Sequence, residues 1–326
     1  MRLLVTGATG KVGQAFIPAF LAEPRFADWD IVALCNRRTL SPQSRIGMVT
    51  GSVADRQVVA QALEGVTHVL HLAAVKETPD QAIDVALKGL YLLLDSFCRS
   101  PTRRQFMLLS GDCVVGHIFQ EYPEPITEQS PRRAYRGVYA LTKVLEETMI
   151  EQFGVQEGLN WTTLRAPWIM EKDDFRYAFE LGDDQFGGPP WSSLIAPAEL
   201  AALREQRCLP ALRDKAGRYL KRSFIDIHDI VRAMLAALDN PVAFGELFNV
   251  AMDRPVDYGD LADRLEAEGH QQRCDIPTPF HSNWLDNSKA RMLLGWRPEI
   301  DLTSLVERAW SYRRAADDPR IVWYPG

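Results

Sequence analysis

Short apolar runs alternate with longer amphipathic stretches through the first half of the chain. The runs have the length and the Val, Ile and Leu content of buried strands, and the stretches between them are long enough for helices. Strands that alternate with helices pair into a parallel, doubly wound sheet with right-handed crossovers, so we predict an α/β fold. The predicted strands are residues 3–5, 31–34, 49–53, 67–74, 106–110 and 161–165, and the predicted helices are residues 14–21, 55–64, 79–98 and 139–153.

The pattern becomes irregular after residue 165, where proline, acidic and aromatic residues accumulate. We therefore expect two unequal parts: residues 1–165, joined by parts of 222–252, and a smaller C-terminal α/β lobe over residues 166–326. Periodicity returns in this lobe, with predicted strands at residues 224–227 and 246–250 and predicted helices at residues 229–238, 258–268 and 302–313.

Three glycines with the spacing G-x-x-G-x-x-G follow the first predicted strand and precede the first predicted helix. Gly7 permits a tight turn, Gly10 lets the backbone approach a pyrophosphate, and Gly13 lets the helix pack closely against the strand. The N-terminus of that helix then faces the anion. This order of elements predicts a dinucleotide-binding domain of the Rossmann type over residues 1–165. The C-terminal lobe has no second loop of this kind and is expected to bind the substrate.

Tyr139 and Lys143 are four residues apart on a predicted helix and therefore share one face. A tyrosine normally loses its proton at about pH 10, and an adjacent ammonium group lowers that pKa. Such a tyrosine can take a proton from an alcohol or give one to a ketone near neutral pH. The spacing alone is equally compatible with an ordinary pair on a helix surface.

Composition and charge narrow the possible functions. The chain has 326 residues and a net charge of −6, so it lacks the basic surplus of a nucleic-acid-binding protein. Its five cysteines form no CxxC motif, and the acidic pairs at 173–174 and 183–184 are interpreted as loop charges, so no metal is expected. The chain shows neither a signal sequence nor an apolar run of the ~20 residues that span a membrane, so we expect a cytoplasmic protein.

Motifs along nearly the whole chain resemble those of the extended short-chain dehydrogenase/reductases, in particular the NAD(P)-dependent sugar epimerase/dehydratase group. The resemblance implies that Tyr139 is the acid/base and that Lys143 lowers its pKa and holds the nicotinamide ribose. It also implies that Lys76 lies near the cofactor, as a lysine of UDP-sugar 4-epimerases does. The similar segments are residues 6–13, HLAA at 71–74, YALTK at 139–143, LRAP at 164–167, RSFIDIHD at 222–229, SKAR at 288–291 and LGWRP at 294–298.

The motifs and the resemblance together suggest the remaining site residues. Trp168 is a candidate for stacking on a sugar or base, and Arg222 for binding an anionic group; the alternatives are a core position and a pair with an acid. Lys76 and Asp112 complete the expected substrate contacts. The residues expected at the cofactor are Gly7, Thr9, Gly10, Lys11, Val12, Asn36, Arg37, Arg38, Ser52, Val53, Leu72, Ala73, Ala74, Lys76, Tyr139, Lys143 and Pro167.

The segment after the fifth predicted strand departs from the family pattern. Aligned on Val114 and Gly116, it puts Gly111 where the family has a hydroxyl group. Ser110 is one residue early, and a shift of one residue normally turns a side chain to the other face of a strand. Either a local distortion presents Ser110 to the substrate or Asp112 takes over that contact, so both are candidate catalytic residues.

The end of the second predicted strand bears on the choice of cofactor. NAD-dependent enzymes commonly place an acidic residue there to bind the ribose hydroxyls, but this position is Cys35. Asn36, Arg37 and Arg38 follow, and two guanidinium groups can hold a 2′-phosphate, so NADP is favoured over NAD. The alternative is that both arginines are solvated at the end of the strand.

We therefore predict an enzyme that oxidises or epimerises a hydroxyl of a sugar or sugar-like substrate through a keto intermediate. The alternatives are an NADP-dependent carbonyl reductase or dehydrogenase, and a nucleotide-binding sensor whose catalytic site is degraded at Gly111. Whether the substrate is nucleotide-linked is left open, because residues 166–168 lack an Asn found in nucleotide-sugar relatives. The predicted helices at 79–98 and 139–153 are apolar on more than one face, which together with the resemblance favours a homodimer.

Overall fold

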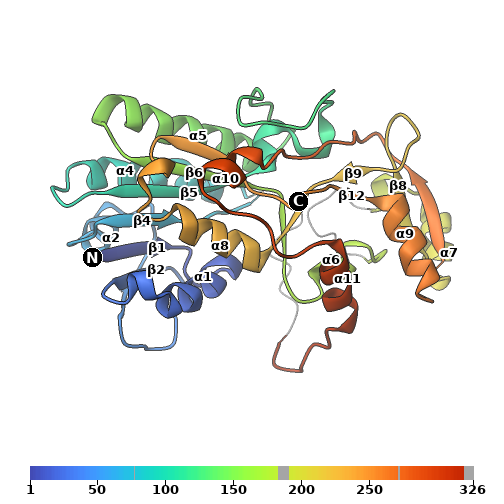
Figure 1. Ribbon diagram of the computed structural model, residues 1–326, viewed down its shortest axis with the longest axis horizontal. Helices are drawn as coiled ribbons and strands as arrows, with labels where there is room; N and C mark the ends of the chain where they lie inside the picture. The colour runs from blue at the N-terminus through green and yellow to red at the C-terminus, as the bar shows by residue number, and fades with distance from the viewer. Residues whose placement is uncertain (77, 183–190, 271, 319–326) are drawn as a thin grey trace.

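The computed structural model describes residues 1–76, 78–182, 191–270 and 272–318, and its largest element is a sheet of seven parallel strands (Figure 1). The sheet confirms the predicted doubly wound α/β fold. Its order reverses direction between the first and the fourth strand along the chain, and ligands of such sheets bind at this point, beyond the carboxyl ends of the strands. In spatial order the strands are β11 (Glu246–Asn249), β6 (Trp161–Ala166), β5 (Gln105–Gly111), β4 (His68–His71), β1 (Arg2–Thr6), β2 (Asp30–Cys35) and β3 (Ile46–Thr50).

Helices cover both faces of the sheet because successive side chains of a strand point to opposite sides. Leu3 and Val5 of β1 pack in one hydrophobic core with α1 (Lys11–Ala22) and α8 (Ile227–Ala237). Leu4 faces the other core, which includes residues of α2 (Arg56–Ala62), α4 (Leu90–Cys98) and α5 (Val138–Glu157). Figure 1 shows α1 and α8 on one side of the sheet and α4 and α5 on the other.

Several elements differ in their bounds from the sequence-based expectation; the strand predicted at 67–74, for example, is only His68–His71. The predicted strand at 49–53 lies earlier, at β3, because Gly51 adopts a φ of +152° and begins a turn that ends at Asp55, the N-cap of α2. The predicted helix at 79–98 is helical throughout but consists of α3 (Pro79–Ala82), the π-helical segment η2 (Ile83–Gly89) and α4.

The C-terminal lobe has its own core, which residues Phe175, Phe179, Phe224 and Tyr258 help to form. Three pairs of short strands frame it: β7 (Trp168–Met170) with β10 (Phe224–Asp226), β8 (Leu209–Arg213) with β13 (Arg273–Pro277), and β9 (Lys221–Arg222) with β12 (Val256–Asp257). Its helices are α6 (Asp174–Ala178), α7 (Pro197–Glu205), α9 (Tyr258–Ala267) and α11 (Leu302–Ser311), while α10 (Ser288–Leu293) packs near β11. The acidic pair at 183–184 lies outside the described residues.

Short 3-10 segments complete the described chain, and two of them, η3 and η4, lie at the end of β5. The segments are η1 (Pro24–Phe26), η3 (Asp112–Val115), η4 (His117–Phe119), η5 (Trp191–Ser193) and η6 (Pro241–Ala243).

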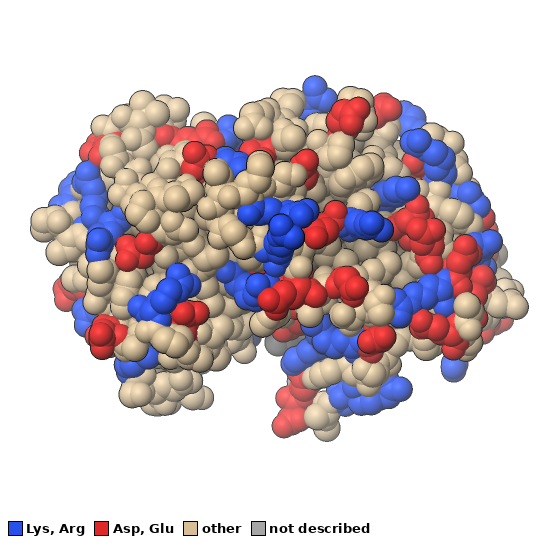
Figure 2. All heavy atoms as spheres, viewed as in Figure 1, with Lys and Arg blue, Asp and Glu red and all other residues tan. Residues whose placement is uncertain are grey.

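Figure 2 shows basic and acidic side chains interspersed over both parts of the visible face. Within the described ranges, no helix combines the length and the apolar character needed to cross a membrane.

Candidate active site

The glycine loop joins β1 to α1 and leaves the N-terminus of the helix open. Gly7 has a φ of +67°, and a Cβ there would lie 2.7 Å from the backbone nitrogen of Ala73. A Cβ on Gly13 would lie 2.6 Å from the carbonyl oxygen of Ala8, so both positions exclude a side chain. Gly10 is the N-cap of α1 and provides no side-chain cap, so the N–H groups of the first turn are available to an anion.

A cavity of about 430 Å³ lies between this loop, the ends of β4 and β5, and the start of the C-terminal lobe. Of the residues predicted for the site, all but Arg37 and Arg222 line it. Tyr135 and His117 also line it but are not among the predicted site residues; Tyr135 lies in the loop before α5, and His117 directly follows Gly116. The predicted residues on the wall are Gly7, Thr9, Gly10, Lys11, Val12, Asn36, Arg38, Ser52, Val53, Leu72, Ala73, Ala74, Lys76, Ser110, Asp112, Tyr139, Lys143, Pro167 and Trp168.

The end of β2 supplies one arginine to the cavity. Asn36 and Arg38 line the cavity together with Ser52 and Val53, whereas Arg37 is exposed and does not. Cys35 is buried, so the strand end carries no carboxylate. Of the two arginines considered for a 2′-phosphate, only Arg38 therefore lies at the cavity.

Tyr139 and Lys143 lie on the first two turns of α5, and both side chains reach the cavity. The ammonium group of Lys143 donates hydrogen bonds to the carbonyl oxygen of Leu109 (3.0 Å) and to Oε2 of Glu146 (2.7 Å). Loss of hydration raises the pKa of Tyr139 well above its usual value, and Cys113 and other nearby groups add to the effect. The expected lowering of the Tyr139 pKa by Lys143 is therefore not found, because Tyr139 is desolvated and the carboxylate of Glu146 offsets the charge of Lys143.

A second lysine faces Tyr139 across the cavity. The Nζ atom of Lys76 lies 5.1 Å from the centroid of the Tyr139 ring, a distance typical of a cation–π contact. Burial lowers the pKa of Lys76 to about 8. Lys76 therefore carries its charge at neutral pH and loses it in mildly alkaline solution.

The end of β5 shows how the missing hydroxyl group is arranged. A Cβ on Gly111 would lie 3.9 Å from the Tyr139 hydroxyl and 3.3 Å from Sγ of Cys113, so Gly111 faces the tyrosine. Ser110 is buried and donates its hydroxyl hydrogen to Glu147 at 2.6 Å. The backbone at Gly111 is extended, with φ −141° and ψ 160°, so the distortion that would turn Ser110 toward the substrate is not present.

Asp112 belongs to a chain of side chains that leads away from the cavity. Nδ1 of His117 lies 2.6 Å from Oδ2 of Asp112, and Nε2 of His117 contacts Nη2 of Arg222. Because an arginine can only donate, Nε2 accepts and Nδ1 carries the hydrogen that Asp112 accepts. Burial lowers the pKa of His117, consistent with this neutral form.

Arg222 lies behind this chain, not at the cavity wall. It is 3% exposed, and its guanidinium carbon lies 3.7 Å from the centroid of the Trp168 ring. Trp168 itself lines the cavity and stacks on His117. Sequence reasoning placed Arg222 at the substrate, but the structure gives it contact with two residues that line the cavity.

The residues present fit a nicotinamide dinucleotide. Without a side chain, Gly7 lets the loop pack against Leu72 and Ala73, and Gly13 lets α1 pack against the loop. The uncapped N-terminus of α1 suits a diphosphate, and Tyr139 and Lys143 line the same cavity. Fold and site together define an NAD(P)-dependent enzyme of the extended short-chain dehydrogenase/reductase type. The chain belongs to the NAD dependent epimerase/dehydratase family, whose model matches residues 3–170.

Curated relatives and solved structures agree with this assignment. GDP-6-deoxy-D-mannose reductase of Pseudomonas aeruginosa is 26% identical over 309 residues, which are 92% of this chain and 93% of the relative. UDP-glucuronate 4-epimerase 4 of Arabidopsis thaliana is 25% identical, over 94% of this chain and 74% of the relative. A short-chain dehydrogenase/reductase superfamily protein from Agrobacterium tumefaciens, solved with bound NAD, has a TM-score of 0.75 at 25% identity and covers 95% of this chain and 96% of its own.

Proposed function

We propose that this enzyme oxidises or epimerises a hydroxyl group of a sugar or sugar-like substrate through a keto intermediate. The observation that carries the proposal is the position of Tyr139, whose hydroxyl faces Gly111 in the same cavity as the glycine loop. An acid/base at that point can exchange a proton with a substrate hydroxyl while a cofactor on the loop is within reach. The sugar-acting relatives support the class of substrate.

The residues that hold the cofactor follow from the cavity wall. The N-terminus of α1 would bind the diphosphate, Lys143 the nicotinamide ribose, and Arg38 with Asn36 a 2′-phosphate, which favours NADP over NAD. When bound, a nicotinamide ring supplies the acceptor or donor of a hydride. Tyr139 would take or give the proton that accompanies this hydride transfer.

Asp112 replaces the missing hydroxyl group in this proposal. Asp112 follows Gly111 in the chain and lines the cavity, and its carboxylate is held by His117, so it can accept a hydrogen bond from a substrate hydroxyl. Lys76 and Trp168 are the other substrate contacts, and Arg222 acts on the site through His117 and Trp168.

A net reductase or dehydrogenase is the second candidate. Arg38 favours it, because a cofactor with a 2′-phosphate suits net reduction, and one relative is itself named a reductase. A sensor without catalysis is the third, and its support is Gly111. The pair of Tyr139 and Lys143 in the cavity argues against it, since a sensor requires neither.

The test is the replacement Tyr139→Phe, assayed on a panel of free and nucleotide-linked sugars and carbonyl compounds with NAD(H) and NADP(H). We expect a loss of most of the turnover with dinucleotide binding retained, because only the phenolic hydroxyl is removed. Full activity of the variant on a substrate of the wild type would contradict the assignment. Tight binding with no turnover by the wild type across the panel would favour the sensor.

We also propose a cytoplasmic homodimer. Ile83 and Tyr91, on η2 and α4, and Leu141 and Leu145 on α5 are large apolar side chains exposed by 38–49%. These helices contact one another, so their exposed apolar residues lie on neighbouring elements, and a second copy would cover them. Sedimentation should show a dimer in the wild type and a monomer in Leu141→Glu; a monomeric wild type would contradict the proposal.

A further inference from the structure

The side chain of Lys11 connects the glycine loop to the C-terminal lobe. Lys11 is the first residue of α1, and its Nζ atom donates to the carbonyl oxygen of Ile169 (2.8 Å) and to Oδ2 of Asp174 (2.9 Å). Only 12% of the Lys11 side chain and 7% of the Asp174 side chain are exposed. Lys11 and Ile169 both line the cavity, so this contact joins two of its walls.

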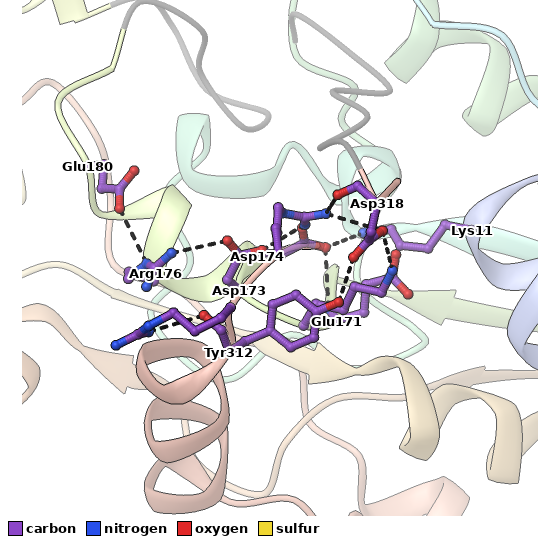
Figure 3. Close-up of polar contacts among 11 residues, drawn as sticks. Lys11, Glu171, Asp173, Asp174, Arg176, Glu180, Tyr312 and Asp318 are labelled. Carbon is purple, nitrogen blue, oxygen red and sulfur yellow. Dashed lines mark hydrogen bonds and ion pairs between the residues drawn. The ribbon is translucent and has the colours of Figure 1, made fainter. Parts of the chain in front are cut away.

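The lobe end of this contact is itself held in place. Oδ2 of Asp174 also accepts a hydrogen bond from the backbone nitrogen of Glu171 at 3.3 Å. Arg314, from the segment after α11, lies 2.6 Å from Oδ1 of Asp173 and 3.9 Å from Oδ1 of Asp174. Figure 3 shows Lys11 approaching from one side of a cluster in which Asp174 and Asp173 lie beside residues of that C-terminal segment.

The C-terminal segment is tied to the same region by a second group of contacts. Asp318 accepts from Lys172 (2.7 Å) and from the Tyr312 hydroxyl (2.5 Å). Residues 312–318 therefore brace the turn between β7 and α6 that carries Asp174. A braced carboxylate loses little freedom on pairing with Lys11, which strengthens the contact.

We propose that Lys11 and Asp174 form a clasp that closes the cavity beside the cofactor diphosphate and slows release of the dinucleotide. The proposal rests on the proposed function, because it requires a diphosphate at the N-terminus of α1. Lys11 follows Gly10 directly, so the clasp lies next to the N–H groups that would bind this diphosphate. A dinucleotide retained in this way stays in place between the two halves of an epimerisation.

A direct contact of Lys11 with the diphosphate is the competing explanation, and it predicts the opposite effect at Asp174. If the ammonium group of Lys11 binds the phosphate directly, Asp174 competes with the phosphate for it, and removing the carboxylate strengthens cofactor binding. If the two residues act as a clasp, removing either one opens the same contact. The sign of the effect of Asp174→Asn therefore separates the two explanations.

The experiment measures release of NADPH by stopped-flow fluorescence, with excess NADP⁺ as the displacing ligand. The variants are Lys11→Met, Asp174→Asn and the double variant. The control is Lys221→Met, which breaks a Lys–Asp pair with Asp257 (3.2 Å) that lies outside the cavity lining. We expect each single variant to release NADPH about tenfold faster, a change of about 1.4 kcal/mol. The double variant should be no faster than the single variants, and the control should match the wild type.

Slower release from Asp174→Asn, or multiplied effects in the double variant, would overturn the clasp. If Asp174→Asn does not fold, the association rate of Lys11→Met decides: an unchanged or faster rate supports the clasp, and a slower rate overturns it in favour of direct phosphate attraction. A wild type that binds neither NADPH nor NADH overturns the proposed function as well. If the wild type binds the cofactor normally and Lys11→Met releases NADPH at the wild-type rate, only the clasp is overturned.

Discussion

Glu147 is the centre of a buried network behind the candidate site. Its carboxylate accepts hydrogen bonds from Ser110 (2.6 Å), from Arg132 (3.0 Å), and from two nitrogens of Arg165 (3.1 and 2.8 Å). Arg165 is 1% exposed, so Glu147 is the group that offsets its charge inside the protein. Burial alone would raise the pKa of Glu147, but Arg165 and the hydrogen bonds outweigh it and lower the pKa below that of an ordinary glutamate.

The replacement Glu147→Gln keeps the shape of the side chain and removes its charge. Breaking a buried pair from one side leaves an uncompensated charge and costs about 3–5 kcal/mol, a large part of the roughly 5–15 kcal/mol that stabilises a typical domain. Because the pKa of Glu147 is lowered by folding, its contribution is present above the usual pKa and is lost as the pH falls through the folded value. The difference between wild type and variant should therefore narrow in acid.

The assay is urea unfolding followed by circular dichroism at neutral and acidic pH. Two controls frame the result. Arg56→Ala removes an ion pair with Asp95 in which Arg56 is 58% exposed, and it should cost less than about 1 kcal/mol. The double replacement of Glu147 and Arg165 by leucine should recover most of the loss, because neither charge is left unpaired. A loss below about 1 kcal/mol for Glu147→Gln would refute the reasoning.

Three further predictions concern the loop, the catalytic centre and the pH dependence of stability. Gly13→Ala puts a Cβ 2.6 Å from the Ala8 carbonyl oxygen. The resulting strain of about 1–3 kcal/mol should weaken NADPH binding about 5- to 150-fold, measured by fluorescence titration. An unchanged affinity would be inconsistent with this packing. Gly111→Ser adds the missing hydroxyl, so it should restore at least about tenfold activity to an Asp112→Asn variant in a turnover assay; no recovery would argue against Asp112 as its replacement. Burial lowers the pKa of His71 to about 3. Below pH ~6.5 the unfolded chain therefore binds a proton at this residue that the folded protein does not. As the pH decreases from there, the free energy of unfolding should fall by about 1.4 kcal/mol per pH unit. Urea midpoints at pH 7 and 5 should show a smaller fall in His71→Asn than in the wild type.

The parallel sheet and the glycine loop are the parts that the sequence predicts well. Apolar periodicity marks β1, β2, β4, β5 and β6 because buried strands need continuous apolar residues, and Gly7 and Gly13 are sites where no side chain fits. The end of β3 is less predictable, because it depends on the conformation of one residue, Gly51. The position of Gly111 where the family has a hydroxyl group is also predicted, because it depends only on the alternation of side chains along the strand.

Contacts between distant segments are not encoded in local patterns. The motif at residues 222–229 suggests that Arg222 binds the substrate, yet the structure buries Arg222 against Trp168 and His117. The partnership of Lys11 with Asp174 depends on how the lobe packs on the loop, so the acid reads as a loop charge in the sequence. The pKa of Tyr139 depends on its hydration, which spacing to Lys143 does not reveal.

The central claim is that the cavity holds a nicotinamide dinucleotide, and the most direct test is to denature the purified protein and identify the released nucleotide by mass. An empty protein should then be titrated with NADPH and NADH. We expect near-stoichiometric NADP or NAD, or saturable binding of NADPH in preference to NADH. Stoichiometric NAD would support in-place recycling and remove the role proposed for Arg38. No released dinucleotide and no binding of either reduced cofactor would contradict the account.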